Sequence, residues 1–174
     1  MNNKNIKKLN NFIVPAIIIL LLSATRLIPH PYNFSPILAA GIFSGFYFRK
    51  FYLSFFIVAL SMFIGDLFLG FHDTMFFTYI SMGIAVAIGL YIKNFKFKEI
   101  IFSGLISSLS FYVITNFGAW LTLEMYAKDF SGLLQSYIMA IPFFHNTLLS
   151  TFFYLIVFKI LFNLATRKKF SFSF

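Results

Sequence analysis

The charged residues of this 174-residue chain are sorted to one side of its apolar segments, which constrains its fold more than any other feature. Twelve of the 14 Lys and Arg residues lie at every other junction between apolar runs, namely Lys4, Lys7, Lys8, Arg49, Lys50, Lys93, Lys96, Lys98, Lys159, Arg167, Lys168 and Lys169. The intervening junctions hold Arg26, Lys128 and four of the five acids. Because short loops rich in Lys and Arg stay in the cytoplasm, the pattern predicts an all-α polytopic membrane protein with six transmembrane helices and both termini cytoplasmic.

The apolar runs predict one transmembrane domain over residues 1–174. Its spans are expected at about 12–28, 36–48, 51–69, 75–92, 100–123 and 143–165. Three prolines within residues 29–36 exclude a regular helix there, so this segment is either an ordered outer loop or a re-entry that dips into the protein. Residues 132–141 are typical of a short outer amphipathic helix, after which Pro142 breaks or kinks the chain.

Composition excludes several classes of protein. With 60% hydrophobic and 11% charged residues, a soluble domain of this length has too little core to bury its apolar surface. The net charge of +9 lies beside the apolar spans, which favours a lipid bilayer with anionic headgroups over nucleic acid as the partner. The chain has no cysteine and no sequence signature of a phosphate loop, a metalloprotease or a serine hydrolase. We therefore predict neither an enzyme nor a cofactor.

Two charged residues lie inside apolar runs. A charge at the membrane centre costs about 2.5–3.5 kcal/mol on insertion scales, and less near an interface. Arg26 either reaches out to the surface or faces a polar cavity, whereas Asp66 needs a cation or a proton. Since both lie near the outer ends of their spans, we predict an ion pair between them, within about 4 Å. The pair is either structural or part of a binding site.

Two further spans contribute polar residues to the outer side. Asn116 and Trp120 are four residues apart and share one helix face. Trp120 is either a ligand-stacking surface or an interfacial belt residue, and Asn116 is expected to make a buried hydrogen bond or a ligand contact. His145 and Asn146 follow Pro142, where a proline at membrane depth frees backbone carbonyls; the alternative is a helix kink capped by Asn146.

The outer loops hold His30, Asn33, His72 and Asp73. His30 stands between two prolines, which is typical of a loop residue, and Asp73 could instead cap the helix that follows Thr74. The three histidines could share an outer metal site with Asp73 and the span carboxylate, but their spacing matches no ligand motif. We therefore predict no metal.

Four segments carry a family resemblance: RLIPHPYNFSP at 26–36, DLFLGFHDT at 66–74, NFGAW at 116–120 and AIPFFHNT at 140–147. Through them the chain resembles an uncharacterised bacterial family of small membrane proteins labelled only as transport proteins. Its architecture is also similar to the substrate-binding S components of energy-coupling factor vitamin transporters. That resemblance implies a six-helix bundle, a ligand near the outer face, and a separate transmembrane subunit with ATPases as partners. Ala39, Ala40, Ser44 and Gly45 would form a small-residue docking face.

These observations favour an S-component-like, substrate-binding subunit for transport of a small polar molecule or vitamin across the bacterial inner membrane. Its outward-facing site would comprise Arg26, His30, Asn33, Asp66, His72, Asp73, Asn116, Trp120, His145 and Asn146. The alternative is a non-transporting membrane partner or assembly protein. In that case the small-residue faces of the second and fourth spans bind another protein, and the outer polar groups are structural.

Overall fold

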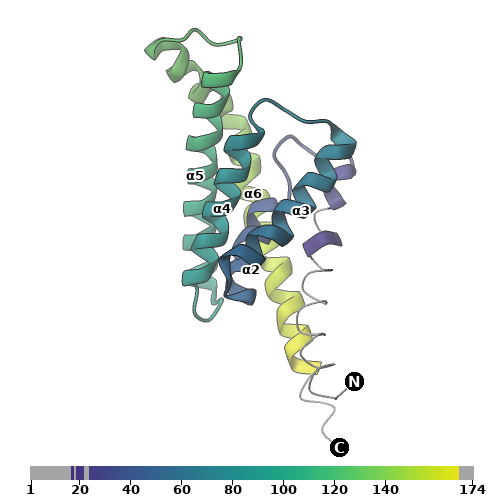
Figure 1. Ribbon diagram of the computed structural model, residues 1–174. Coiled ribbons are helices and arrows are strands. Elements are labelled where there is room, and N and C mark those ends of the chain that lie inside the picture. Colours follow the sequence, from purple (N-terminus) through teal and green to yellow (C-terminus); the bar gives the residue numbers. More distant parts are fainter. Residues whose placement is uncertain (1–16, 18, 22–23, 169–174) are drawn as a thin grey trace, which may run out of the picture.

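The computed structural model describes residues 17, 19–21 and 24–168, and this part of the chain is helical, with no strand. Its elements are η1 (Thr25–Leu27), α2 (Ile37–Phe48), α3 (Phe51–Leu69), α4 (Met75–Tyr91), α5 (Phe97–Thr122) and α6 (Phe130–Lys168) (Figure 1). The predicted boundaries of the second, third and fourth apolar segments agree with α2, α3 and α4 to within one residue. Residues 12–16, 18, 22 and 23 of the predicted first span lie outside the described residues.

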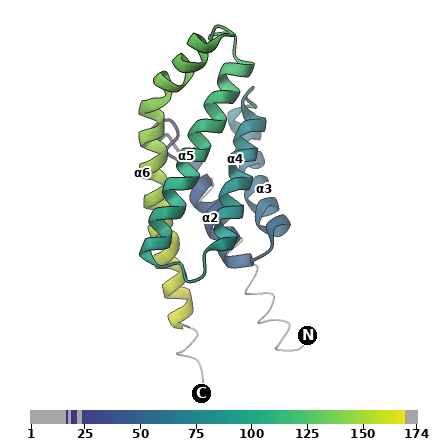
Figure 2. The same ribbon diagram turned by 90° about the vertical axis from the view of Figure 1, so that its left-hand side faces the viewer.

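Helix α2 is the centre of the described structure. It packs against α3, α4, α5 and α6 (Figure 2), and 11 of its 12 residues are buried. At about 1.5 Å per residue it is about 18 Å long, which is shorter than the roughly 30 Å hydrocarbon core of a bilayer. Its uniform apolarity therefore reflects burial inside the protein on all sides, and not contact with lipid.

Small residues bring α2 and α4 into backbone contact. A Cβ atom added at Gly45 would overlap the carbonyl oxygen of Val86, and one added at Gly89 would overlap the carbonyl oxygen of Ile42. Such contacts are possible only where side chains are absent, as at close helix crossings in membrane proteins. The small residues Gly41 and Gly45 of α2 thus face α4, and the other small residues of α2 are buried as well. The expectation that they form an external docking face is wrong, because this face is buried within the chain itself.

An aromatic cluster fills the end of the structure where α2 stops. Phe43 stacks on Phe158 with ring centroids 4.7 Å apart, and Phe46 stacks on Phe95 at 4.8 Å. Phe95 has a φ of 49°, an uncommon conformation for a bulky residue. It is held there by the stack with Phe46, by an edge contact with Phe43 at 5.6 Å between ring centroids, and by Lys159, whose Nζ donates to its carbonyl oxygen at 2.6 Å. This network ties the α4–α5 loop to α6.

Helix α6 continues through Pro142, so the prediction of a separate helix at 132–141 is wrong. The proline removes one N–H donor, which bends a helix without ending it when neighbouring groups hold both halves. Helix α5 supplies these groups. Tyr112 donates its hydroxyl hydrogen to the carbonyl of Tyr137 at 2.7 Å, and Tyr137 donates to the carbonyl of Val113 at 3.0 Å. The α5–α6 pair consequently extends beyond the other helices at one end (Figure 1).

Three helices are long and apolar enough to cross a membrane: α3, α5 and the Phe130–Leu164 part of α6. Helices α2 and α4 are apolar but shorter. Large hydrophobic side chains are exposed along the three long helices, for example Phe68, Phe102 and Ile160. A surface of this kind is favourable in lipid and costly in water, so these helices are consistent with a membrane protein.

Candidate functional site

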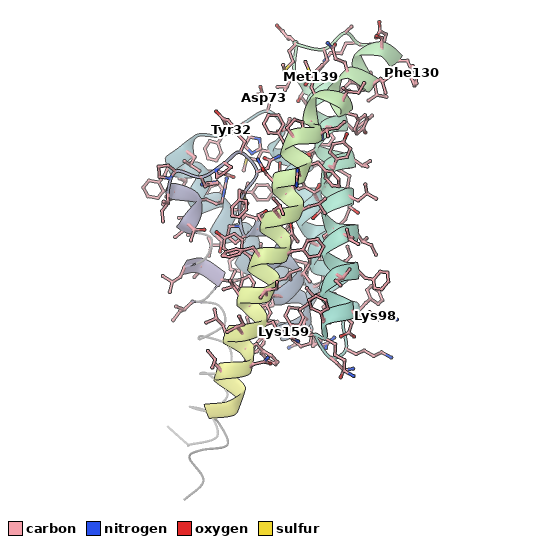
Figure 3. All side chains as sticks on the ribbon, turned by 180° about the vertical axis from the view of Figure 1, so that it is seen from behind. Tyr32, Asp73, Lys98, Phe130, Met139 and Lys159 are labelled. Carbon is pink, nitrogen blue, oxygen red and sulfur yellow. The ribbon has the colours of Figure 1, made fainter. Side chains whose placement is uncertain are left out.

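A partly open cavity of about 450 Å³ lies among the 28–36 segment, the α3–α4 loop, α5 and α6. This volume falls within the range of about 300–1,000 Å³ that small-molecule sites occupy. Tyr32 and Asp73, chain neighbours of lining residues, lie toward the end of the molecule opposite Lys98 and Lys159 (Figure 3). Many of the lining side chains are amides or hydroxyls: Asn33, Ser35, Thr74, Thr78, Thr115, Asn116, Thr147, Ser150 and Thr151.

The segment between η1 and α2 is irregular and forms one wall of this cavity. Asn33 lies in the left-handed region with a φ of 61°. The backbone is tied to α6: Asn146 Nδ2 donates to the carbonyl of Tyr32 at 3.0 Å, and Ser150 Oγ donates to the carbonyl of Asn33 at 3.4 Å. These bonds satisfy carbonyl groups that no regular helix satisfies. Asn146 is therefore a brace for this segment and is not itself a lining residue.

The predicted ion pair between Arg26 and Asp66 is confirmed. Arg26 Nη2 lies 3.0 Å from Asp66 Oδ1, and Tyr79 Oη donates to Asp66 Oδ2 at 3.2 Å. Arg26 Nη1 also donates to the carbonyl of Met62 at 3.2 Å. Gly65 makes room for the guanidinium, since a Cβ there would stand 2.8 Å from Arg26 Nη1. Asp66 is 1% exposed and lies behind Arg26, which lines the cavity.

Both loop histidines line the cavity, whereas Asp73 does not. His30 Nδ1 donates to the carbonyl of Ile28 at 2.6 Å, and His72 Nδ1 is 2.9 Å from Thr74 Oγ1. Asp73 is exposed, and the residue that caps α4 is Thr74, without a side-chain cap bond, so the capping alternative for Asp73 is wrong. Within the described ranges, no group of three or more His, Cys, Asp or Glu residues could hold a metal ion.

The two predicted residues of α5 have different surroundings. Asn116 lines the cavity, and its Nδ2 donates to the carbonyl of Tyr112 at 2.7 Å. Trp120 instead donates its Nε1 hydrogen to the carbonyl of Ala127 at 2.9 Å, in the α5–α6 loop. Lys128 Nζ closes this loop by donating to the carbonyl of Trp120 at 2.6 Å. Trp120 and the exposed His145 are not lining residues.

Of the ten predicted site residues, the structure brings five together at the cavity: Arg26, His30, Asn33, His72 and Asn116. Asp66 lies directly behind this wall. Asp73, Trp120, His145 and Asn146 lie outside it.

Several hydroxyl residues line the cavity although the sequence pattern did not lead us to predict them as site residues. Thr147, Ser150 and Thr151 recur at helical spacing in α6, as do Thr74 and Thr78 at the start of α4. A polar stripe of this kind inside an apolar run was a usable signal, because a helix buries such hydroxyls only against another polar surface or by bonding its own carbonyls.

In its described part the protein is all-helical, with three helices suited to a membrane and, at one end, a partly open cavity rich in polar side chains. The chain belongs to a family of unknown function, DUF6580, whose model matches residues 6–172. Membership of an uncharacterised family is thus confirmed. No curated protein and no solved structure matches the chain, so the expected similarity to S components finds no support in these comparisons.

Proposed function

We propose that this protein is the substrate-binding subunit of a membrane transport system. It would span the membrane six times with both termini in the cytoplasm, and bind a small polar molecule that enters from the outer side. One observation carries the proposal: irregular residues 28–36 and the start of the short helix α2 meet at a polar cavity. Irregular backbone at membrane depth is stable only where it is buried in protein or lines a cavity, and interrupted helices form the binding sites of many transporters.

The chemistry of the wall supports a polar ligand. Nine amide or hydroxyl residues line the cavity beside six apolar ones, such as Leu38 and Met62, so a bound molecule would find partners for several hydrogen bonds. The chain has no Walker motif, so an ATP-driven step would require a separate transmembrane subunit and ATPases. The alternative, a non-transporting partner protein, loses its main support, because the small residues of α2 and Gly83, Ala85 and Gly89 of α4 are buried within the chain.

Topology can be tested with single cysteines, since the natural chain has none. Glu124 and Lys98 are exposed, at the α5–α6 loop and near the α4–α5 loop, respectively. With an impermeant maleimide on intact cells, Glu124→Cys is expected to be labelled at once, and Lys98→Cys only after the membrane is permeabilised. Labelling of Lys98→Cys in intact cells, with protection of Glu124→Cys, would contradict the proposed orientation.

Ligand binding can be tested by filling the cavity. Ala119 lines it, and Leu121 is half-exposed two residues further along α5, so Ala119→Phe blocks the cavity and Leu121→Phe is a matched control. Native mass spectrometry of gently purified protein is expected to detect a retained small molecule in the natural protein and in Leu121→Phe, but not in Ala119→Phe. Equal occupancy in all three proteins, or no retained molecule in any, would argue against the proposed function.

A further inference from the structure

We propose that the ligand of this cavity is a small organic anion that carries hydrogen-bond donors, such as a hydroxylated or aminated carboxylate. This inference rests on the proposed binding function and narrows it to a chemical class. Three independent properties of the cavity wall lead to it: its side-chain charges, the backbone donors at the start of α2, and the free oxygen atoms on α5 and α6.

The cavity wall carries a cationic side chain and no acidic one. The lining residues include Arg26, His30 and His72, and none of them is Asp or Glu. The acid nearest to Arg26 is Asp66, which is 1% exposed and does not line the cavity. Its second oxygen accepts a hydrogen bond from Tyr79, so Asp66 keeps a donor even when Arg26 also interacts with a ligand. A negative charge in the cavity therefore meets the Arg26 guanidinium and two histidine rings, and no carboxylate lines the wall.

The backbone supplies further donors. Helix α2 begins at the cavity with Pro36 as its cap residue, and no side chain caps it. The N–H groups of Ile37, Leu38 and Ala39 have no hydrogen-bond acceptor among the described residues, although all three residues are buried. Ile37 and Leu38 line the cavity. Buried, unpaired N–H groups at a helix start are costly without a partner, and the helix dipole favours an anionic one.

The walls from α5 and α6 offer acceptors instead. Thr115 and Thr147 donate their hydroxyl hydrogens to the carbonyls of Phe111 and Phe143, at 2.7 and 2.9 Å. Asn116 uses its amide N–H on its own helix, and its Oδ1 has no donor in the described part of the chain. The oxygen atoms of these side chains remain free to accept. The ligand must therefore bring donors of its own, which an alkyl carboxylate lacks.

Three related probes distinguish the effect of the ligand's negative charge from the effect of its hydrogen-bond donors. Gluconate has both, gluconamide keeps the hydroxyls without the charge, and hexanoate keeps the charge without the hydroxyls. Purified protein is heated with about 20 mM of each, because a ligand that binds only the folded state raises Tm. Gluconate is expected to raise Tm, with a Kd about tenfold or more below those of the other two. An equal effect of gluconamide or hexanoate, or no effect of gluconate, would overturn the anionic, donor-bearing class.

Two substitutions test whether gluconate raises Tm by binding in the cavity. His72→Gln removes a lining histidine, and His145→Gln removes an exposed histidine outside the cavity. The first should weaken the gluconate response several-fold, and the second should leave it unchanged; equal effects would overturn the assignment. Should gluconamide stabilise as well as gluconate, yet fail with Ala119→Phe, the anion inference falls and the binding function stands. If no probe raises Tm and native mass spectrometry detects no retained molecule, both the anion inference and the proposed binding function are contradicted.

Discussion

Gly89→Ala is expected to destabilise the protein by about 3 kcal/mol or more, the upper end of overpacking effects. The added Cβ would overlap the carbonyl group of Ile42 on the central helix α2, and a backbone group cannot move aside as a flexible side chain can. Moving α2 would also disturb the wall of the cavity, because Ile37 and Leu38 belong to this helix. Thermal unfolding in detergent, together with the yield of monodisperse protein, measures the effect.

Gly83→Ala is the matched control on the same helix. A Cβ at Gly83 would stand 3.5 Å from Phe55 Cε2, an ordinary van der Waals contact. Alanine is also the better helix former, so this variant should be as stable as the natural protein or slightly more stable. If Gly83→Ala and Gly89→Ala were equally destabilised, the close crossing of α2 and α4 would not be the cause.

The second large effect concerns the buried ion pair. Arg26→Gln leaves the carboxylate of Asp66 buried with Tyr79 as its remaining partner, and Asp66→Asn leaves a mostly buried guanidinium without its counter-ion. Each single change is expected to cost about 3–5 kcal/mol, the range for breaking a buried pair from one side. The double variant removes both charges and should be more stable than either single variant.

A double-mutant cycle in thermal or denaturant unfolding measures this coupling directly. Additive losses, with the double variant the least stable of the four proteins, would show that the 3.0 Å contact contributes no coupling energy. The ligand response of the double variant then separates structure from binding. A folded double variant that no longer responds to gluconate indicates that Arg26 also serves the cavity.

Much of the fold was predictable because it depends on local composition. The bounds of α2, α3 and α4 follow from where apolar runs stop at Arg49, Gly70 and Lys93. The Arg26–Asp66 pair was predictable for an energetic reason: each charge is too costly inside an apolar run without a partner. The position of Trp120 outside the cavity was not predictable, because a tryptophan near a helix end is equally suited to a ligand site, to a membrane interface and to a hydrogen bond that holds a loop.

The sequence by itself determined which segments are apolar helices, where the positive charges concentrate, and that two charged residues inside those segments must be compensated. Only the tertiary structure decided that α2 is a core helix, that α6 continues through Pro142, and which polar side chains face the cavity. The physical reason is that apolarity is a property of each residue, whereas burial in protein or in lipid depends on neighbours far away in the chain. Rotation of a helix about its axis, set by contacts such as that of Gly45 with Val86, then decides whether a hydroxyl meets the cavity or its own backbone.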